Sequence, residues 1–213
     1  MLEVLGLSID HVVQDVTFCV AAGEVLALVG EPGCGRTAAL SALFGIARNA
    51  TGTIALDGTR LAIGHPRDAI AAGFAFVPAD RKALRLVLRP SVGDSLALGA
   101  LRRMLRPDAP VLSRLRDLSI KVPGLGAEVA TISGGDHPKM MVGAWLERMP
   151  RVVLLDEPTR GVNAAGRAEI YALVEELVAQ GAAVVLASSD RAAIARLADR
   201  EHELVREAWR ESA

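Results

Sequence analysis

The sequence predicts an α/β fold: a mainly parallel sheet wrapped by helices, with an N-terminal antiparallel β section and an inserted helical subdomain. Short apolar runs alternate with longer helical patterns along most of the chain, which is the order that βαβ units produce. Of the 213 residues, 51% are hydrophobic but only 3% are aromatic, so the core must be built of Val, Leu, Ile and Ala. Such a core suits buried parallel strands covered by helices.

The first part of the chain carries most of the predicted strands. Apolar runs indicate each of them, and the segment TGTIALDG ends in the Asp57–Gly58 pair, which is typical of a tight turn. The expected strands are 2–7, 12–20, 24–29, 51–58 and 74–77, and the expected helices are 36–46 and 65–72.

The same alternation returns near the C-terminus. The expected helices there are 136–149, 163–180 and 191–198, and the expected strands are 152–155, 182–187 and 202–205. The intervening segment is rich in Arg, Leu and Pro, with helical patches at 91–105 and 113–118. We interpret the chain as one domain over 1–213, with a core of about 1–80 and 150–213 and a helical subdomain of about 81–149.

Charge and hydropathy argue against several classes of protein. The net charge of −1 gives no support for a general nucleic-acid binder. No apolar run approaches the roughly 18 residues that span a bilayer, and we expect no signal peptide. The two cysteines, Cys19 and Cys34, do not indicate a disulfide framework. We therefore expect a soluble, cytosolic chain without a nucleic-acid partner.

Residues 30–37, GEPGCGRT, match the phosphate-binding template G-x-x-x-x-G-K-[ST] except that Arg36 takes the place of lysine. The loop follows an apolar strand and opens a helix, so its amides and the helix N-terminus can face phosphates, and Thr37 can offer its hydroxyl to Mg²⁺. The alternative is a glycine-rich turn without a ligand. Because a guanidinium is planar and forked, nucleotide binding survives this replacement more easily than hydrolysis does. The expected nucleotide contacts are Gly30, Glu31, Pro32, Gly33, Cys34, Gly35, Arg36, Thr37 and Ala38.

A second candidate element is RVVLLDEPTRG, residues 151–161, in which two carboxylates end an apolar strand. Asp156 is positioned to hold Mg²⁺ directly or through water. Glu157 is the candidate catalytic residue, because it can orient or deprotonate the attacking water. The acidic pair alone is a weak signal, but it follows the glycine-rich loop by about 120 residues, and that combination is strong.

A third element, ISGGDHPK, places Ser133, Gly134 and Gly135 before a helix that begins near Asp136, giving a second phosphate-binding helix N-terminus. Together the three elements resemble the ATP-binding cassette (ABC) ATPases, a class of P-loop NTPases. The resemblance implies ATP and Mg²⁺ as cofactors. It also implies two cassettes packed head to tail, with each ATP between the phosphate loop of one cassette and the S-G-G signature of the other.

The resemblance covers nearly the whole chain and can be narrowed. The segments GRTAAL, PADRKALRLVLRPSVGDSLAL, LLDEPTRGVNAAGRAEIY and LASSD look like the second cassette of bacterial monosaccharide importers (ribose, galactose and xylose type). That cassette commonly has Arg in the phosphate loop. The resemblance implies membrane permease subunits as partners and a peripheral location at the inner face of the cell membrane.

Several residues expected of an active cassette are missing. Ser188, Ser189 and Asp190 follow the strand after which the catalytic histidine normally stands, and no glutamine loop is present. No aromatic residue lies between residues 2 and 15 to stack on adenine. Further departures from the second-cassette pattern are Ala79, Asp136, His137, Pro138 and Asn163.

These departures leave three hypotheses open. The chain is an ATPase subunit that works with a complete cassette and is weakly hydrolytic alone, a nucleotide-responsive scaffold without catalysis, or a self-sufficient homodimer. Other P-loop classes, such as kinases and GTPases, fit the S-G-G helix and the D-E-P-T sequence poorly. The transported solute cannot be read from this sequence, because the resemblance assigns specificity to a binding protein and a permease.

Overall fold

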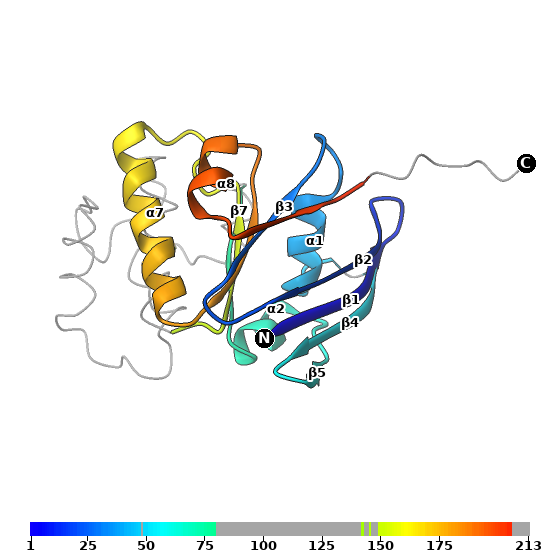
Figure 1. Ribbon diagram of the computed structural model, residues 1–213. Helices are drawn as coiled ribbons and strands as arrows, with labels where there is room; N and C mark the ends of the chain where they lie inside the picture. The colour runs from blue at the N-terminus through cyan, green and yellow to red at the C-terminus, as the bar shows by residue number, and fades with distance from the viewer. Residues whose placement is uncertain (48, 80–141, 143–144, 146–148, 206–213) are drawn as a thin grey trace, which may run out of the picture.

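The computed structural model describes residues 1–47, 49–79, 142, 145 and 149–205. In these ranges the chain forms a four-stranded sheet of order β2-β1-β4-β5 and a five-stranded sheet of order β6-β7-β8-β3-β9. Helices α7 and α8 lie on one side of the five-stranded sheet, and α1 and the four-stranded sheet lie on the other (Figure 1). The predicted α/β architecture is confirmed.

The four-stranded sheet is antiparallel and begins the chain, as expected. Its strands are β1 (Leu2–Ile9), β2 (Val13–Val20), β4 (Ala50–Leu56) and β5 (Thr59–Leu61). Asp57 and Gly58 both have positive φ, 48° and 75°, as a two-residue hairpin turn requires. The turn was expected, but β5 was not, because its three residues carry no burial pattern that hydropathy can detect.

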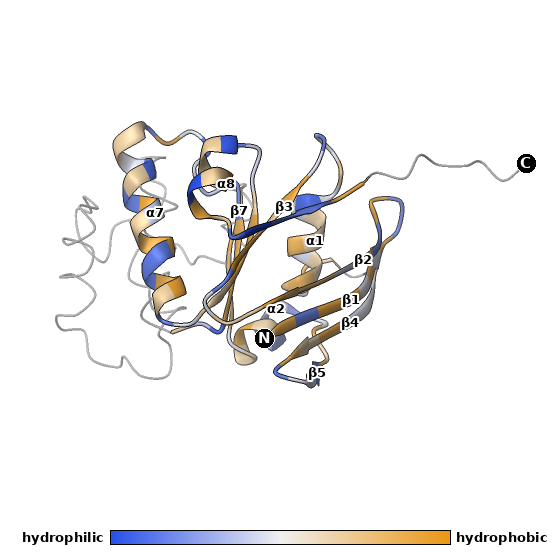
Figure 2. Ribbon diagram, viewed as in Figure 1, coloured by the Kyte–Doolittle hydropathy of each residue, from blue (hydrophilic) through white to orange (hydrophobic). Residues whose placement is uncertain are grey.

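The five-stranded sheet is parallel throughout. Its strands are β3 (Val25–Val29), β6 (Phe74–Val77), β7 (Val152–Asp156), β8 (Ala183–Ala187) and β9 (Arg200–Glu203). The first four are short apolar runs, of which β3 and β7 are labelled in Figure 2, and nearly every residue in them is buried on both faces. Strand β9 begins two residues before the expected 202. Its sequence REHE is polar, so pairing with β3 at the sheet edge sets its position.

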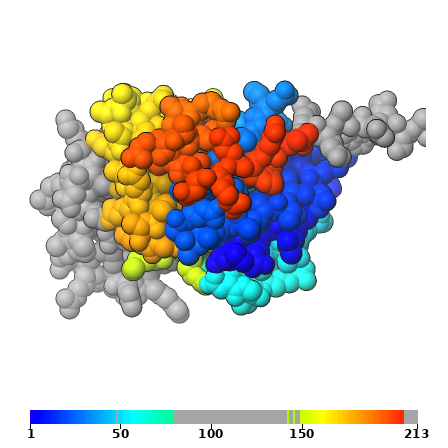
Figure 3. Space-filling model, in the orientation of Figure 1, coloured from blue at the N-terminus to red at the C-terminus, as the bar shows by residue number. Residues whose placement is uncertain are grey.

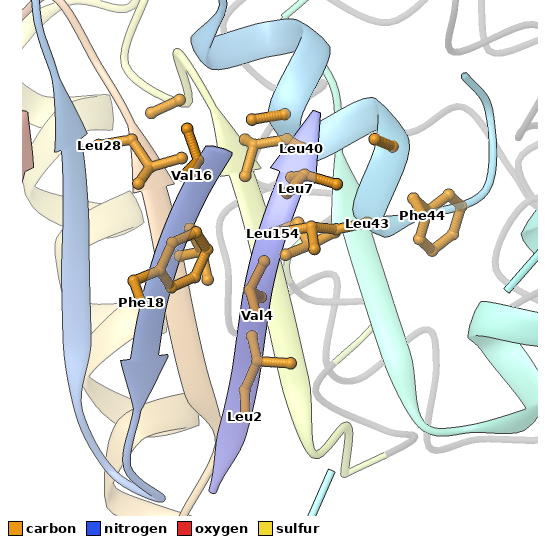
Figure 4. Packing of buried hydrophobic residues seen from close by; sticks show 14 of the residues in the cluster. Leu2, Val4, Leu7, Val16, Phe18, Leu28, Leu40, Leu43, Phe44 and Leu154 are labelled. Atoms are coloured by element: carbon orange, nitrogen blue, oxygen red, sulfur yellow. The ribbon is translucent and has the colours of Figure 1, made fainter. Parts of the chain in front are cut away.

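Two hydrophobic cores fill the spaces on either side of this sheet. Successive residues of a strand face opposite sides, so in β7 Leu154 joins the core beneath the antiparallel sheet while Val153 and Leu155 join the other. Figure 4 shows the first core, where side chains of β1 meet Leu40 and Leu43. The second is closed by α7 through Ile170, Leu173, Val174 and Leu177. The helices are α1 (Arg36–Leu43), α2 (Pro66–Ala71), α7 (Ala164–Ala179) and α8 (Arg191–Leu197).

The predicted helical subdomain, 81–149, falls almost entirely outside the described residues, as do its patches at 91–105 and 113–118. Its exceptions are Val142, Trp145 and Met149, of which Val142 and Trp145 are helical and buried in the second core. The indole nitrogen Nε1 of Trp145 donates to the carbonyl of Phe76 at 3.2 Å. The division into core and subdomain therefore stays a prediction.

The end of the described chain is held against its beginning. In Figure 3 the red β9 residues lie beside blue residues of the N-terminal third. Arg200 donates to the Glu24 carboxylate and, through Nη2, to the carbonyl of Cys19 at 2.8 Å. Among the described residues, the structure has no helix with both the length and the apolar character needed to cross a membrane.

Candidate nucleotide-binding site

Three loops meet at the carboxyl edge of the parallel sheet. Strands β7, β8 and β3 are neighbours and run in the same direction, so the residues that follow them emerge at the same edge. These are the glycine-rich loop after β3, the acidic pair at the end of β7, and residues 188–190 after β8. This edge is where open α/β sheets bind ligands.

The glycine-rich loop has a backbone that only glycine tolerates at its two ends. Gly30 and Gly35 have φ of 141° and 98°. A Cβ on Gly30 would lie 2.5 Å from the carbonyl oxygen of Leu204, and one on Gly35 would lie 2.4 Å from Cγ2 of Val13. The loop therefore packs closely against the C-terminal end of the described chain and against the β1–β2 turn. The positive φ and the close contacts explain why the template has glycine at both positions.

Helix α1 begins directly after this loop with Gly35 as its N-cap. Within the described residues, no side chain hydrogen-bonds to this helix start, and the first turn of α1 carries no acidic residue. The first amides of a helix have no acceptor within it and carry the positive end of its dipole. The arrangement can accept an anion such as a phosphate.

The Arg36 side chain folds back over the loop. Its Nη1 donates to the carbonyl of Gly30 at 2.8 Å, and its Nη2 lies 3.8 Å from Oε1 of Glu157. Both ionic side chains are largely buried, with 15% and 14% of their surface exposed. Arg36 thus links the glycine-rich loop to the acidic pair across the edge of the sheet.

Asp156 is 2% exposed and lies against Thr37, whose hydroxyl donates to Oδ1 at 3.1 Å. Its other oxygen, Oδ2, is buried and has no hydrogen-bond partner among the described residues. Burial raises the pKa of Asp156 above its ordinary value and the Glu157 charge adds to this, whereas hydrogen bonding from Thr37 and the Ala79 amide and the Arg36 charge oppose it. A buried carboxylate with a free oxygen beside a hydroxyl fits Mg²⁺, which binds oxygen and often takes few protein ligands alongside phosphates.

Glu157 has a backbone conformation unusual for its type, with φ of 47°. Such a conformation costs on the order of 1–3 kcal/mol and persists only where the surroundings enforce it. Here the Glu157 amide donates to the carbonyl of Ala187 at 2.8 Å. Its carboxylate accepts the Ser189 amide at 2.7 Å and the buried Ser188 hydroxyl at 3.5 Å. The serines found in place of a histidine hold the candidate catalytic carboxylate.

Of the predicted residues of the glycine-rich loop, Thr37 contacts Asp156 and Arg36 lies against Glu157. Ser133, Gly134 and Gly135 lie outside the described residues, and their role stays a prediction. Asn163 caps α7, its side chain accepting the Gly166 amide at 2.9 Å.

Sequence reasoning missed that Ser188 and Ser189 contact Glu157. A signal that could have found these contacts is the tendency of successive parallel strands to be neighbours, which would place the segments after β7 and β8 side by side.

Comparison with known proteins agrees with this geometry. The sequence profile of the ABC transporter family matches residues 13–160. A putative ribose/galactose/methyl galactoside import ATP-binding protein of Agrobacterium fabrum is 41% identical over 206 residues, covering 93% of this chain and 41% of that protein. A ribose import ATP-binding protein of Streptomyces avermitilis is 39% identical over 208 residues, covering 94% of this chain and 40% of that protein.

A solved structure of an ATP-binding subunit of an ABC transporter superposes with a TM-score of 0.78 at 27% identity, covering 97% of this chain and 86% of that one. This chain spans about 40% of the length of the curated relatives it matches. The profile match, the shared fold and the phosphate loop with its acidic pair lead to one conclusion: the chain belongs to the ABC transporter family and has the P-loop α/β fold of its ATP-binding cassettes.

Proposed function

We propose that the chain is the ATP-binding subunit of a sugar-type ABC importer, which binds Mg-ATP between two head-to-tail cassettes and couples ATP binding and hydrolysis to solute transport. The observation that carries this proposal is the convergence of Arg36, Thr37, Asp156 and Glu157 on the glycine-rich loop. The names of the relatives support the sugar-import assignment, since both describe ribose-type import.

Each residue of the edge has a role in this proposal. The loop amides, the start of α1 and Arg36 bind the phosphates, as a helix N-terminus and a forked cation do. Thr37 and Asp156 hold Mg²⁺, which when bound neutralises phosphate charge. Glu157 orients the attacking water or accepts its proton. Arg36 exchanges Glu157 for a phosphate oxygen when nucleotide binds, which frees that carboxylate.

The proposal includes weak hydrolysis by the chain alone. Ser188 and Ser189 contact Glu157 where the resemblance places a histidine, and a serine hydroxyl does not carry protons near neutral pH as an imidazole does. The resemblance implies an aromatic ring ahead of the phosphate loop to stack on adenine, and none lies between residues 2 and 15. The turn between β1 and β2 adjoins Gly35 and offers Val12 instead, which is 41% exposed.

The partners we propose are a second cassette and membrane permease subunits. In a head-to-tail pair, Ser133–Gly135 of this chain would complete the ATP site of the partner. That partner is either a second copy of this chain or a separate complete cassette. The assembly would then lie on the cytoplasmic side, at the inner face of the cell membrane.

The test is Mg-ATP turnover by the purified chain, alone and mixed with a complete sugar-importer cassette. Alone, we expect slow turnover that disappears in Glu157→Gln. In the mixture we expect faster turnover that Gly134→Asp and Ser133→Ala in this chain abolish, while Glu201→Gln, which removes an exposed ion pair with Arg191, does not. Full activity of both signature variants would contradict the division of labour. Transport in cells that is indifferent to Glu157→Gln would instead indicate a nucleotide-responsive scaffold.

A further inference from the structure

Asp190 joins parts of the structure that the proposed chemistry does not use. Its Oδ1 caps α8 by accepting the amides of Ala192 and Ala193 at 3.1 and 3.4 Å. Its Oδ2 accepts Nη1 of Arg167 at 2.7 Å and the hydroxyl of Thr159 at 3.2 Å. One carboxylate therefore binds the start of α8, a residue of α7, and the loop that follows β7.

Arg167 binds that same loop a second time. Its Nε donates to the carbonyl of Val162 at 3.0 Å, while its Nη1 reaches Asp190. Thr159, also in the loop, is 1% exposed and is held by Asp190. The ion pair therefore fixes residues 157–163 relative to residues 188–190.

Glu157 bridges these two segments. Its backbone belongs to the first, in a left-handed conformation with φ of 47°, and its carboxylate is bound by Ser188 and Ser189 of the second. The Asp190 amide donates to the Ser188 hydroxyl at 3.0 Å, so Asp190 also fixes the group that contacts the carboxylate. Moving either segment would change where the Glu157 carboxylate lies.

We propose that Asp190 and Arg167 are positioning residues for Glu157, acting by holding the 188–190 segment against the 157–163 segment. The inference rests on the proposed function for what Glu157 does, whereas the positional claim concerns only where its carboxylate is held. The ion pair is partly exposed, with 39% of Arg167 and 21% of Asp190 accessible. Partly exposed pairs contribute little to overall stability, so the effect expected here is local.

Two variants separate positioning from helix capping. Asn caps helices about as well as Asp, so Asp190→Asn keeps the start of α8 while removing the charge that pairs with Arg167. Arg167→Gln removes the other charge, and Arg167→Lys restores it. Glu201→Gln is the matched control. It removes the 3.0 Å ion pair between Glu201 and Arg191, the residue that follows Asp190 at the start of α8.

The experiment is amide hydrogen exchange by NMR on the full 213-residue chain without nucleotide. The Ser189 amide reports on the Glu157 carboxylate directly, because it donates to Oε1, and Glu157→Ala, which removes that acceptor, sets the value without the hydrogen bond. We expect Asp190→Asn and Arg167→Gln to speed exchange at Ser189 by about tenfold, toward that value. In both variants we expect amide exchange at Ala193 to stay slow. Arg167→Lys should return the Ser189 exchange rate to that of the parent, and Glu201→Gln should leave the exchange rates at Ser189 and Ala193 unchanged.

Unchanged Ser189 exchange in both variants would overturn the inference. So would equal acceleration at Ser189 and Ala193, because that indicates loss of the α8 start rather than positioning. The readout needs neither nucleotide nor turnover, so a chain that failed to bind ATP would refute the proposed function and leave this result decisive. Where turnover is measurable, both variants should lower kcat with little change in KM.

Discussion

Nη2 of Arg36 lies 3.8 Å from Oε1 of Glu157, so the cation of the phosphate loop faces the carboxylate proposed to act on water. The same guanidinium holds the carbonyl of Gly30 through Nη1. Both side chains are mostly buried, and charged pairs interact more strongly where water is excluded. A bound phosphate would therefore compete with Glu157 for Arg36.

Replacing Arg36 tests this exchange. Arg36→Ala should weaken Mg-ATP binding at least about tenfold, because hydrogen bonds to charged groups contribute about 1.5–3 kcal/mol. Arg36→Lys should bind within about threefold of the parent, since it keeps the charge that phosphates attract. Equilibrium titration with nucleotide measures both. Arg67→Ala removes an exposed positive charge elsewhere and serves as the control. Equal affinity of Arg36→Ala and the parent would remove Arg36 from the site.

A pair of glycine substitutions separates backbone strain from close contact. Gly30 and Gly181 both have positive φ, but a Cβ on Gly181 meets nothing within 4 Å, whereas one on Gly30 meets backbone at 2.5 Å. Gly181→Ala should cost about 1–2 kcal/mol of unfolding free energy. Gly30→Ala should cost about 1–3 kcal/mol more, because backbone must move. Urea unfolding measures both, and equal losses would contradict the close packing of the phosphate loop.

The burial of Asp156 predicts a pH dependence of stability in metal-free buffer. Because its pKa is raised in the folded chain, the folded state binds its proton more tightly than the unfolded state does. The unfolding free energy should therefore fall as pH rises from the ordinary carboxyl range through the raised pKa. Asp156→Asn lacks this ionisation and should lose that decrease, and it should be more stable than the parent at neutral pH. Urea unfolding in EDTA, repeated from the ordinary carboxyl range up to neutral pH, checks the prediction. Unfolding free energies of the parent and Asp156→Asn that change with pH in the same way would contradict it.

How well the sequence predicted the elements depended on their burial. Strands β3 and β7 are buried apolar runs, and their hydropathy alone indicated them. Strands β5 and β9 are short or polar, so their positions depend on pairing partners that hydropathy does not encode.

The candidate site divides in the same way. The phosphate loop and the acidic pair are local patterns, so a template could find Thr37 and Asp156. The contacts of Glu157 with Ser189, and of Asp190 with Arg167, join residues far apart in sequence. They depend on β8 lying beside β7 and on the side-chain directions after each strand. Those follow from the packed sheet, which no local pattern specifies.

The central claim is that this edge of the sheet binds Mg-ATP, and isothermal titration of the purified chain with ATP, in Mg²⁺ and again in EDTA, tests it most directly. The account predicts one nucleotide per chain and an affinity that falls clearly when Mg²⁺ is removed, because Thr37 and Asp156 then have no cation to share with the phosphates. No binding at millimolar ATP, or the same affinity with and without Mg²⁺, would contradict it.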